Sequence, residues 1–164
     1  MKMNKLKIIT IITLLVSNNL YSATMTITGS VSPGTCSTGV SDNYTFDLGD
    51  DIGASTLQVV GSETATVSHD VVLGGCPAGM KSVTATFTGT PYGTSNFQNG
   101  GTAKNIAINI SDTLGVTYGN NSTMTVTVDA AGNATFPLQA KGVSTGNTTV
   151  GTISTAVVLS FTYN

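Results

Sequence analysis

The chain has 164 residues, of which only 9% are charged, and its formal net charge is −2. It contains two cysteines, one histidine and no tryptophan. This sparse, slightly acidic set of charges cannot form the basic face that a nucleic-acid-binding protein needs, and an anionic membrane surface is an equally poor partner. β-branched residues together with 19 glycines favour strands and turns over helices.

Residues 1–22 have the features of a secretory signal peptide. Three lysines precede an apolar run over residues 8–16 that is too short to span a bilayer. We expect cleavage after Ser22, which leaves one domain of about 142 residues beginning at Ala23. No second long apolar run occurs, so we expect an exported protein without a membrane span. The mature chain would keep three lysines, no arginine and eight acids, a net charge of −5.

Short alternating segments separated by Gly- and Asn-rich turns predict strands, and no segment has a convincing helical stripe. Several strands at short, regular spacing are typical of an all-β sandwich with an immunoglobulin-like plan. Pro137 suggests an edge strand or a bulge, and residues 47–55 and 91–101 are expected to be loops. The predicted strands cover residues 25–31, 44–49, 66–76, 82–89, 105–110, 123–128, 134–142 and 152–164.

Cys36 and Cys76 are the two cysteines of the chain. Because an exported protein passes through an oxidising compartment, we predict a single disulfide between them. A closed zinc site is excluded, since two cysteines and one histidine do not supply four ligands.

Candidate catalytic and ion-binding groups are few. His69 is followed by Asp70, but adjacent residues of a strand point to opposite faces, so Asp70 is badly placed to orient the imidazole. We interpret His69 as a solvent-facing residue of a half-buried strand. Asp47, Asp50 and Asp51 lack the spacing of a calcium loop and are interpreted as a solvated acidic loop. The sequence therefore predicts no enzyme, no metal site and no cofactor.

Both ends of the mature chain alternate as strands do. Each could be an ordinary edge strand of a self-contained sandwich. Alternatively, the first could be a free arm that adds to the sheet edge of another molecule. In the N-terminal segment the apolar face carries Met25, Ile27, Gly29 and Val31. In the C-terminal segment it carries Val157, Leu159, Phe161 and Tyr163.

Six segments in this order resemble the pilin subunits of chaperone–usher fimbriae of the type 1-like kind. The resemblance covers the whole mature chain and includes the cysteine pair. The segments are FDLG (46–49), HDVVLGGC (69–76), ATFTGTP (85–91), AKNIAINISDTLGVTY (103–118), FPLQAKGVSTG (136–146) and VVLSFTYN (157–164).

The resemblance implies an immunoglobulin-like sandwich that lacks its last strand. Residues 1–22 would be the signal peptide, residues 23–34 the N-terminal donor-strand arm and residues 35–164 the pilin domain. In such fimbriae a periplasmic chaperone lends a strand to the subunit, and at the outer-membrane usher the arm of the next subunit replaces that strand. The chain is therefore expected to be a structural subunit of a cell-surface fimbria used in adhesion, with a chaperone, an usher and other pilin subunits as partners.

The resemblance also assigns roles to residues. The donor face of the arm would be Met25, Ile27, Gly29 and Val31, with Gly29 matching the donor-strand glycine of the family. The chaperone-docking strand and groove wall would be Val157, Leu159, Phe161, Tyr163 and Asn164. The arm is short, and NTTVGT (147–152) lacks the proline usual in the family. The alternative is a secreted, self-complete β-sandwich that binds a ligand such as a carbohydrate.

Overall fold

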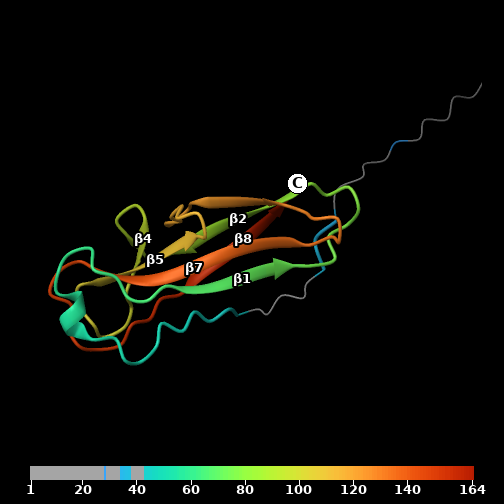
Figure 1. Cartoon of the computed structure of the whole chain (residues 1–164). Helices are drawn as coiled ribbons and strands as arrows, with labels where there is room; N and C mark the ends of the chain where they lie inside the picture. Colours follow the sequence, from blue (N-terminus) through green and yellow to red (C-terminus); the bar gives the residue numbers. More distant parts are fainter. Residues whose placement is uncertain (1–27, 29–33, 38–42) are drawn as a thin grey trace, which may run out of the picture. The chain divides into compact units, whose positions relative to one another are not determined.

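A computed structural model describes residue 28, residues 34–37 and residues 43–164. The chain divides into two compact units, Met1–Val31 and Ser32–Asn164, and the fold below is that of the second unit. Within the described ranges it contains one short 3-10 helix and eight strands (Figure 1). These are η1 (Ala54–Leu57), β1 (Val67–Leu73), β2 (Ser82–Gly89), β3 (Pro91–Tyr92), β4 (Asn96–Gln98), β5 (Ile106–Asp112), β6 (Thr123–Thr127), β7 (Ala134–Ser144) and β8 (Val157–Tyr163).

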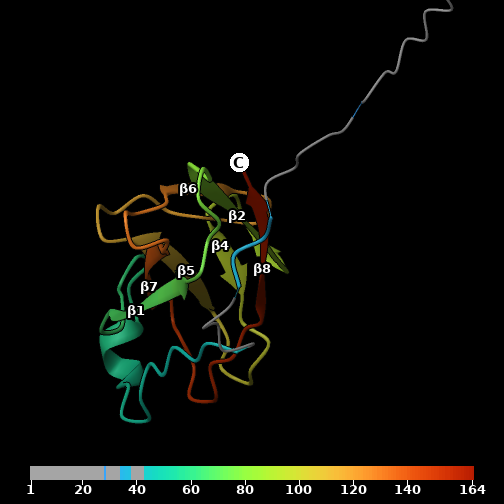
Figure 2. The same ribbon diagram turned by 90° about the vertical axis from the view of Figure 1, so that its right-hand side faces the viewer.

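The strands form two antiparallel sheets that pack as a sandwich. The larger sheet has the order β1-β7-β5-β4-β3, and the smaller has the order β6-β2-β8. Strands β1 and β8 are therefore edge strands, one in each sheet (Figure 2). Figure 1 shows the segment that follows residue 43 running below β1. The predicted all-β sandwich is confirmed.

The core lies between the two sheets and is built from the alternating inward residues of their strands. On β2, Val83, Ala85 and Phe87 are all 0% exposed. Strand β7 contributes Phe136 and Leu138, which are 0% and 2% exposed. A smaller apolar cluster of Leu57, Ala103 and Ile106 packs with Ile52 and Ile153.

Gly89, at the end of β2, lies against Phe97 of the other sheet and against the chain that enters β8. A Cβ atom there would lie 2.9 Å from the Phe97 ring and 3.0 Å from the Ala156 carbonyl oxygen. Any larger residue would have to displace the Phe97 ring or the backbone at Ala156. The start of the C-terminal strand therefore depends on this glycine.

Three sequence-based expectations need correction. Residues 44–49 have half-buried residues at alternate positions, but they belong to no strand, because no ladder pairs with them. Residues 91–101 are not a plain loop, since they contain β3 and β4. Strand β7 is central in its sheet rather than an edge. It tolerates Pro137 because its pairing with β5 ends at Leu138, so Pro137 has a partner only on β1.

Candidate functional site: the open edge of strand β8

Strand β8 is paired on one side only in the part of the chain that the structure describes. It is antiparallel to β2, with a register that runs from Val157 opposite Gly89 to Tyr163 opposite Val83. At the end of this ladder, Asn164 and Ser82 exchange backbone hydrogen bonds, at 2.9 Å and 3.3 Å. Residues that exchange such bonds alternate along an antiparallel pair. The even-numbered residues of β8 therefore direct their N–H and C=O groups to β2.

The odd-numbered residues of β8 direct their N–H and C=O groups away from β2, to the open edge. The other side of β2 supports this phase, because Phe87 bonds through its N–H and C=O to Ser122 and Asn121, next to β6. The open-edge residues are Val157, Leu159, Phe161 and Tyr163. Unpaired backbone groups along an edge are a template for a further strand.

The same four residues turn their side chains towards the core, yet none is fully buried. All four pack against the main cluster as partly buried residues. Phe161 reaches across the sandwich, where its ring lies 5.5 Å from that of Phe136. On the neighbouring strand β2, the inward residues are completely buried. Burial therefore falls from complete to partial within one strand spacing of the edge, as expected of a sheet that can accept another strand.

Residues 43–49 pack beside strand β1. Tyr44 and Phe46 are half-buried and pack against the main cluster. Both rings contact His69 of β1, at centroid distances of 5.3 and 5.8 Å. These contacts attach residues 43–49 to β1 and to the margin of the main core.

The C-terminal residue is held by strand β2. The amides of Lys81 and Ser82 donate to the Asn164 backbone oxygen, and the Asn164 side chain donates to Thr84 Oγ1 at 3.4 Å. Strand β8 is thereby fixed in register up to its last residue.

A buried carboxylate joins the end of β5 to the core under β8. Asp112 is 7% exposed and accepts hydrogen bonds from the amides of Leu114 and Val116 and from the Tyr118 hydroxyl, each at 2.9 Å. The Tyr118 ring stacks on Phe87 at a centroid distance of 4.9 Å. Phe87 in turn is the register partner of a β8 residue. The network therefore holds Tyr118 against Phe87, the β2 residue that lies beside β8.

The two groups of this network shift each other's titration. Burial alone would raise the pKa of Asp112, but hydrogen bonds from the Val116 amide, the Tyr118 hydroxyl and the Leu114 and Gly115 amides together lower it. Burial, followed by the hydrogen bond to Asp112 and its charge, raises the pKa of Tyr118 to about 12. The pair therefore stays a carboxylate and a neutral phenol over a wide pH range.

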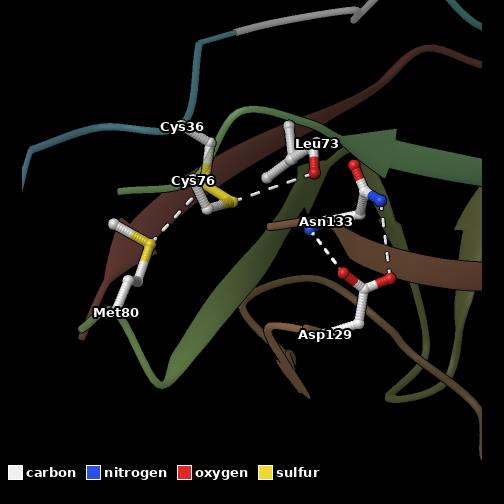
Figure 3. The surroundings of a disulfide bond; sticks show 6 residues. All are labelled: Cys36, Leu73, Cys76, Met80, Asp129 and Asn133. Atoms are coloured by element: carbon white, nitrogen blue, oxygen red, sulfur yellow. Dashed lines mark hydrogen bonds between the residues drawn. A yellow bond between two sulfur atoms is a disulfide. The ribbon is translucent and has the colours of Figure 1, made fainter. Parts of the chain in front are cut away.

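Cys36 and Cys76 form the predicted disulfide, which ties the described residues 34–37 to the chain that follows β1 (Figure 3). The Cys36 sulfur lies 3.5 Å from Met80 Sδ, and the Cys76 sulfur lies 3.8 Å from the Leu73 carbonyl oxygen. Both are packing contacts, because a disulfide sulfur carries no proton to donate. Next to the disulfide, the Asp129 carboxylate accepts a hydrogen bond of 2.8 Å from the backbone amide of Asn133 and so closes a turn.

The structure brings the predicted C-terminal site residues together on one strand, in the alternation that the sequence indicated. The predicted donor residues Met25, Ile27, Gly29 and Val31 lie outside the described residues. His69 is exposed, as expected, but it is not isolated, because two aromatic rings flank it. Nowhere in the described ranges do three His, Cys, Asp or Glu residues come together as a metal site would require. Those ranges also contain no helix that is long and apolar enough to cross a bilayer.

Sequence reasoning missed two parts of this region. It did not foresee that Asp112 and Tyr118 would meet, although an aspartate three residues before Gly115 is a turn signal that could have suggested a side-chain-capped turn. It also did not place Tyr44 and Phe46 beside His69. No local pattern predicts that contact, because 23 or more residues separate the two segments.

The two-sheet sandwich has the fold of a known pilin subunit. Over 80% of this chain and 100% of the other, the fold matches the crystal structure of the P pilus rod subunit PapA, with a TM-score of 0.63 and 21% sequence identity. No protein-family model matches the chain.

Two sequence relatives are closer. The chain is 35% identical over 145 residues to the protein FimG of Escherichia coli strain K12, covering 86% of this chain and 84% of FimG. It is 37% identical over 166 residues to the S-fimbrial adhesin protein SfaS of Escherichia coli O6:K15:H31, covering 97% of this chain and 99% of SfaS. The chain belongs to the chaperone–usher fimbrial subunit family. It is a non-enzymatic fimbrial subunit.

Proposed function

We propose that this chain is a structural subunit that polymerises by donor-strand exchange into a surface fimbria used in adhesion. In this proposal residues 35–164 form the acceptor domain, and the arm over residues 23–34 is the donor for the next subunit. Met25, Ile27, Gly29 and Val31 form the face of the arm that enters the acceptor.

One observation carries the proposal. Val157, Leu159, Phe161 and Tyr163 have inward side chains that are only half-buried, and the same residues direct their backbone groups to the open edge. An added strand would complete the core and the ladder at once. Each fully buried aliphatic or aromatic side chain contributes roughly 1.5–3 kcal/mol, so such a joint would open very slowly.

The partners follow from the same edge. A periplasmic chaperone would occupy it first, and at the outer-membrane usher the arm of another pilin subunit would replace the chaperone. The described contacts of Asn164 leave β8 fixed in register for both pairings. In this scheme the chain is exported through the periplasm and ends in the fimbria at the cell surface.

The test uses the exported full chain with its disulfide intact. Alone, it is expected to form oligomers through arm-to-acceptor pairing. A large excess of the free peptide ATMTITGSVSP, residues 23–33, is expected to cap the chains at one peptide per subunit. Size-exclusion chromatography with native mass spectrometry measures both states. A peptide with Gly29→Leu is the matched control and is expected not to bind.

Two variants at position 159 separate the contribution of the backbone N–H to peptide binding from that of the side chain. Leu159→Pro removes an open-edge N–H without removing a hydrogen bond to β2, whereas Leu159→Ala removes only the side chain. We expect the proline variant to lose far more peptide binding than the alanine variant. The proposal is wrong if the chain is a monomer that does not bind the peptide and if Leu159→Pro changes neither result. The sandwich would then be complete without an added strand.

A further inference from the structure

The Asn99 side chain joins two loops that are far apart in the sequence. Its Nδ2 donates hydrogen bonds to the carbonyl oxygens of Ala103 and Thr152, at 2.9 and 3.2 Å. Its Oδ1 accepts hydrogen bonds from the amides of Gly101 and Ser154, at 3.0 and 2.8 Å. Two of these contacts lie within its own loop and two reach the other loop. We call this arrangement the Asn99 clamp.

Backbone hydrogen bonds close the same junction between the two loops. The amides of Gly100 and Ala103 donate to the carbonyl oxygens of Ser154 and Thr152, at 2.7 and 3.1 Å. The second loop leads into β8, which begins at Val157 (Figure 2, dark red). The clamp is therefore part of the junction that fixes the chain just before β8.

Asn99 and Gly100 form the one Asn–Gly pair of the sequence. In such a pair the glycine nitrogen can attack the side-chain carbonyl carbon of the asparagine, because glycine has no Cβ atom to hinder the approach. The nitrogen gives its proton to water and bonds to Cγ, and the side-chain amine leaves as ammonia. One water molecule then opens the resulting succinimide to aspartate or isoaspartate. The reaction, called deamidation, involves no oxidation or reduction.

The closed clamp holds both reacting groups away from this reaction. The Gly100 N–H, which must lose its proton, is hydrogen-bonded to the Ser154 carbonyl oxygen. The Asn99 amide, which must turn towards that nitrogen, is held at both its oxygen and its nitrogen. Deamidation therefore requires a local opening in which the two loops separate, and such openings cost free energy.

The product of the reaction does not fit the closed clamp. A carboxylate at position 99 can still accept hydrogen bonds from the Gly101 and Ser154 amides, but it has no proton to donate. Its second oxygen would face the carbonyl oxygens of Ala103 and Thr152, and these acceptors would repel it. Isoaspartate would also add one carbon atom to the backbone of a loop whose hydrogen bonds fix its length.

We propose that Asn99 is a deamidation site whose reaction is blocked while the clamp is closed, and that the reaction, once it has taken place, keeps the clamp open. A transient separation of the two loops would thereby become a permanent loosening of the chain before β8. The proposal stands apart from the proposed function, since it involves no second subunit and no added strand.

The first test compares the rate of deamidation in the folded and unfolded chain. The full chain, with its disulfide intact, is incubated in one mildly alkaline buffer with and without urea, and peptide mapping by mass spectrometry measures conversion at position 99. Conversion should be at least about tenfold slower in the folded chain. Equal rates in the two samples, or no conversion in urea, would show that the proposal is wrong.

Gly100→Ala is the matched control for the chemistry. Gly100 does not have a positive φ, and a Cβ atom there would lie 3.5 Å from the Ser154 carbonyl oxygen, an ordinary contact. Alanine therefore fits the closed clamp, but its methyl group hinders the attack on Asn99. The variant should fold and should be converted more slowly than wild-type protein in urea. Equal conversion of both in urea would contradict attack by the residue 100 nitrogen.

The second test asks whether the product keeps the clamp open. In Asn99→Asp, the amides of Gly100 and Ala103 should exchange hydrogen at least about tenfold faster than in wild-type protein. Gln98→Glu makes the same change from amide to carboxylate at an exposed neighbour and should leave both amides unchanged. Wild-type exchange rates in Asn99→Asp would show that the clamp closes around a carboxylate, which would overturn the proposal.

A third measurement uses no variant. Wild-type chain that has been partly deamidated in urea is returned to buffer, and the exchange of intact and converted molecules is compared by mass. Intact molecules should regain slow exchange at Gly100 and Ala103, whereas converted molecules should exchange fast, whether the loosening is local or extends further. Equal exchange in both populations would contradict the proposal.

Discussion

Strands β7 and β8 have the same alternating pattern, but only β7 is completed by its neighbours. Strand β7 pairs with β1 on one side and β5 on the other, and its Phe136 is 0% exposed. Strand β8 pairs with β2 alone, and Phe161, whose ring packs on Phe136, stays half-buried. Alternation therefore determines which face a strand turns to the core, while its lateral neighbours determine how completely that face is buried.

The largest expected effect compares these two phenylalanines directly. Phe136→Ala should destabilise the monomeric subunit by about 3–5 kcal/mol, because it opens a cavity in a closed core. Phe161→Ala should cost less, about 1–2 kcal/mol, because its side chain is already partly solvated. Urea unfolding measures both. Once a donor strand is bound, the cost of Phe161→Ala should rise towards that of Phe136→Ala. Equal costs in the free subunit would contradict the comparison.

Loss of the disulfide should have the next largest effect. The bond closes a loop with a sequence separation of 40 residues. Replacing Cys36 and Cys76 together by alanine should lower the free energy of unfolding by about 2–4 kcal/mol. Met80→Leu, which keeps the bond and most of the packing beside it, is the control and should change stability far less. A double variant as stable as the parent would show that the bond does not constrain the chain.

The Asp112–Tyr118 network should contribute less, with a defined pH dependence. Tyr118→Phe removes one hydrogen bond to a charged group and should cost about 1.5–3 kcal/mol. Because the fold lowers the pKa of Asp112, its contribution is present above the unfolded value of about 3.9 and is lost as the pH falls through the folded value.

At the alkaline limit the sign is reversed. The fold raises the pKa of Tyr118 to about 12, so its contribution is complete below about 10 and is lost as the pH rises through the folded value. Unfolding midpoints measured across both limits test the pair. Asp112→Asn should reduce the loss of stability that occurs at acid pH. If the unfolding midpoint of this variant falls at acid pH as much as that of the parent, other carboxyl groups cause the loss.

The smallest effect is expected on the outer face of β8. Val158 is 61% exposed and alternates away from the core. Val158→Thr should therefore change the free energy of unfolding by no more than about 0.5 kcal/mol and leave peptide binding intact. Leu159→Thr, the same kind of change one residue later, should weaken binding of the 23–33 peptide. If both variants weaken binding equally, the two faces of β8 do not have different roles.

The sequence predicted side-chain direction well because burial is periodic. Residues 82–89 coincide with β2, and the expected strands at 123–128 and 134–142 are close to β6 and β7. The four inward residues of β8 were also identified correctly, because alternation continues to the last residue. These successes share one cause, which is that a half-buried strand must repeat its apolar residues at every second position.

Backbone pairing could not be predicted in the same way. Residues 44–49 alternate like a strand, yet they have no ladder, since the side-chain pattern does not say whether a neighbouring strand exists. The β3–β4 hairpin was missed because strands of two and three residues are too short to show a period. The neighbourhood of His69 depends on Tyr44 and Phe46, which reach it only in the folded sandwich.

The most direct measurement is amide hydrogen exchange along β8, in the free subunit and after addition of the 23–33 peptide. In the free subunit the amides of Val158, Ser160, Thr162 and Asn164 should be protected by β2, while those of Val157, Leu159, Phe161 and Tyr163 should exchange readily. Strand addition should protect the second set and leave the first unchanged. If the odd-numbered amides are already protected in the free subunit, or stay unprotected with the peptide bound, then β8 is not the acceptor edge.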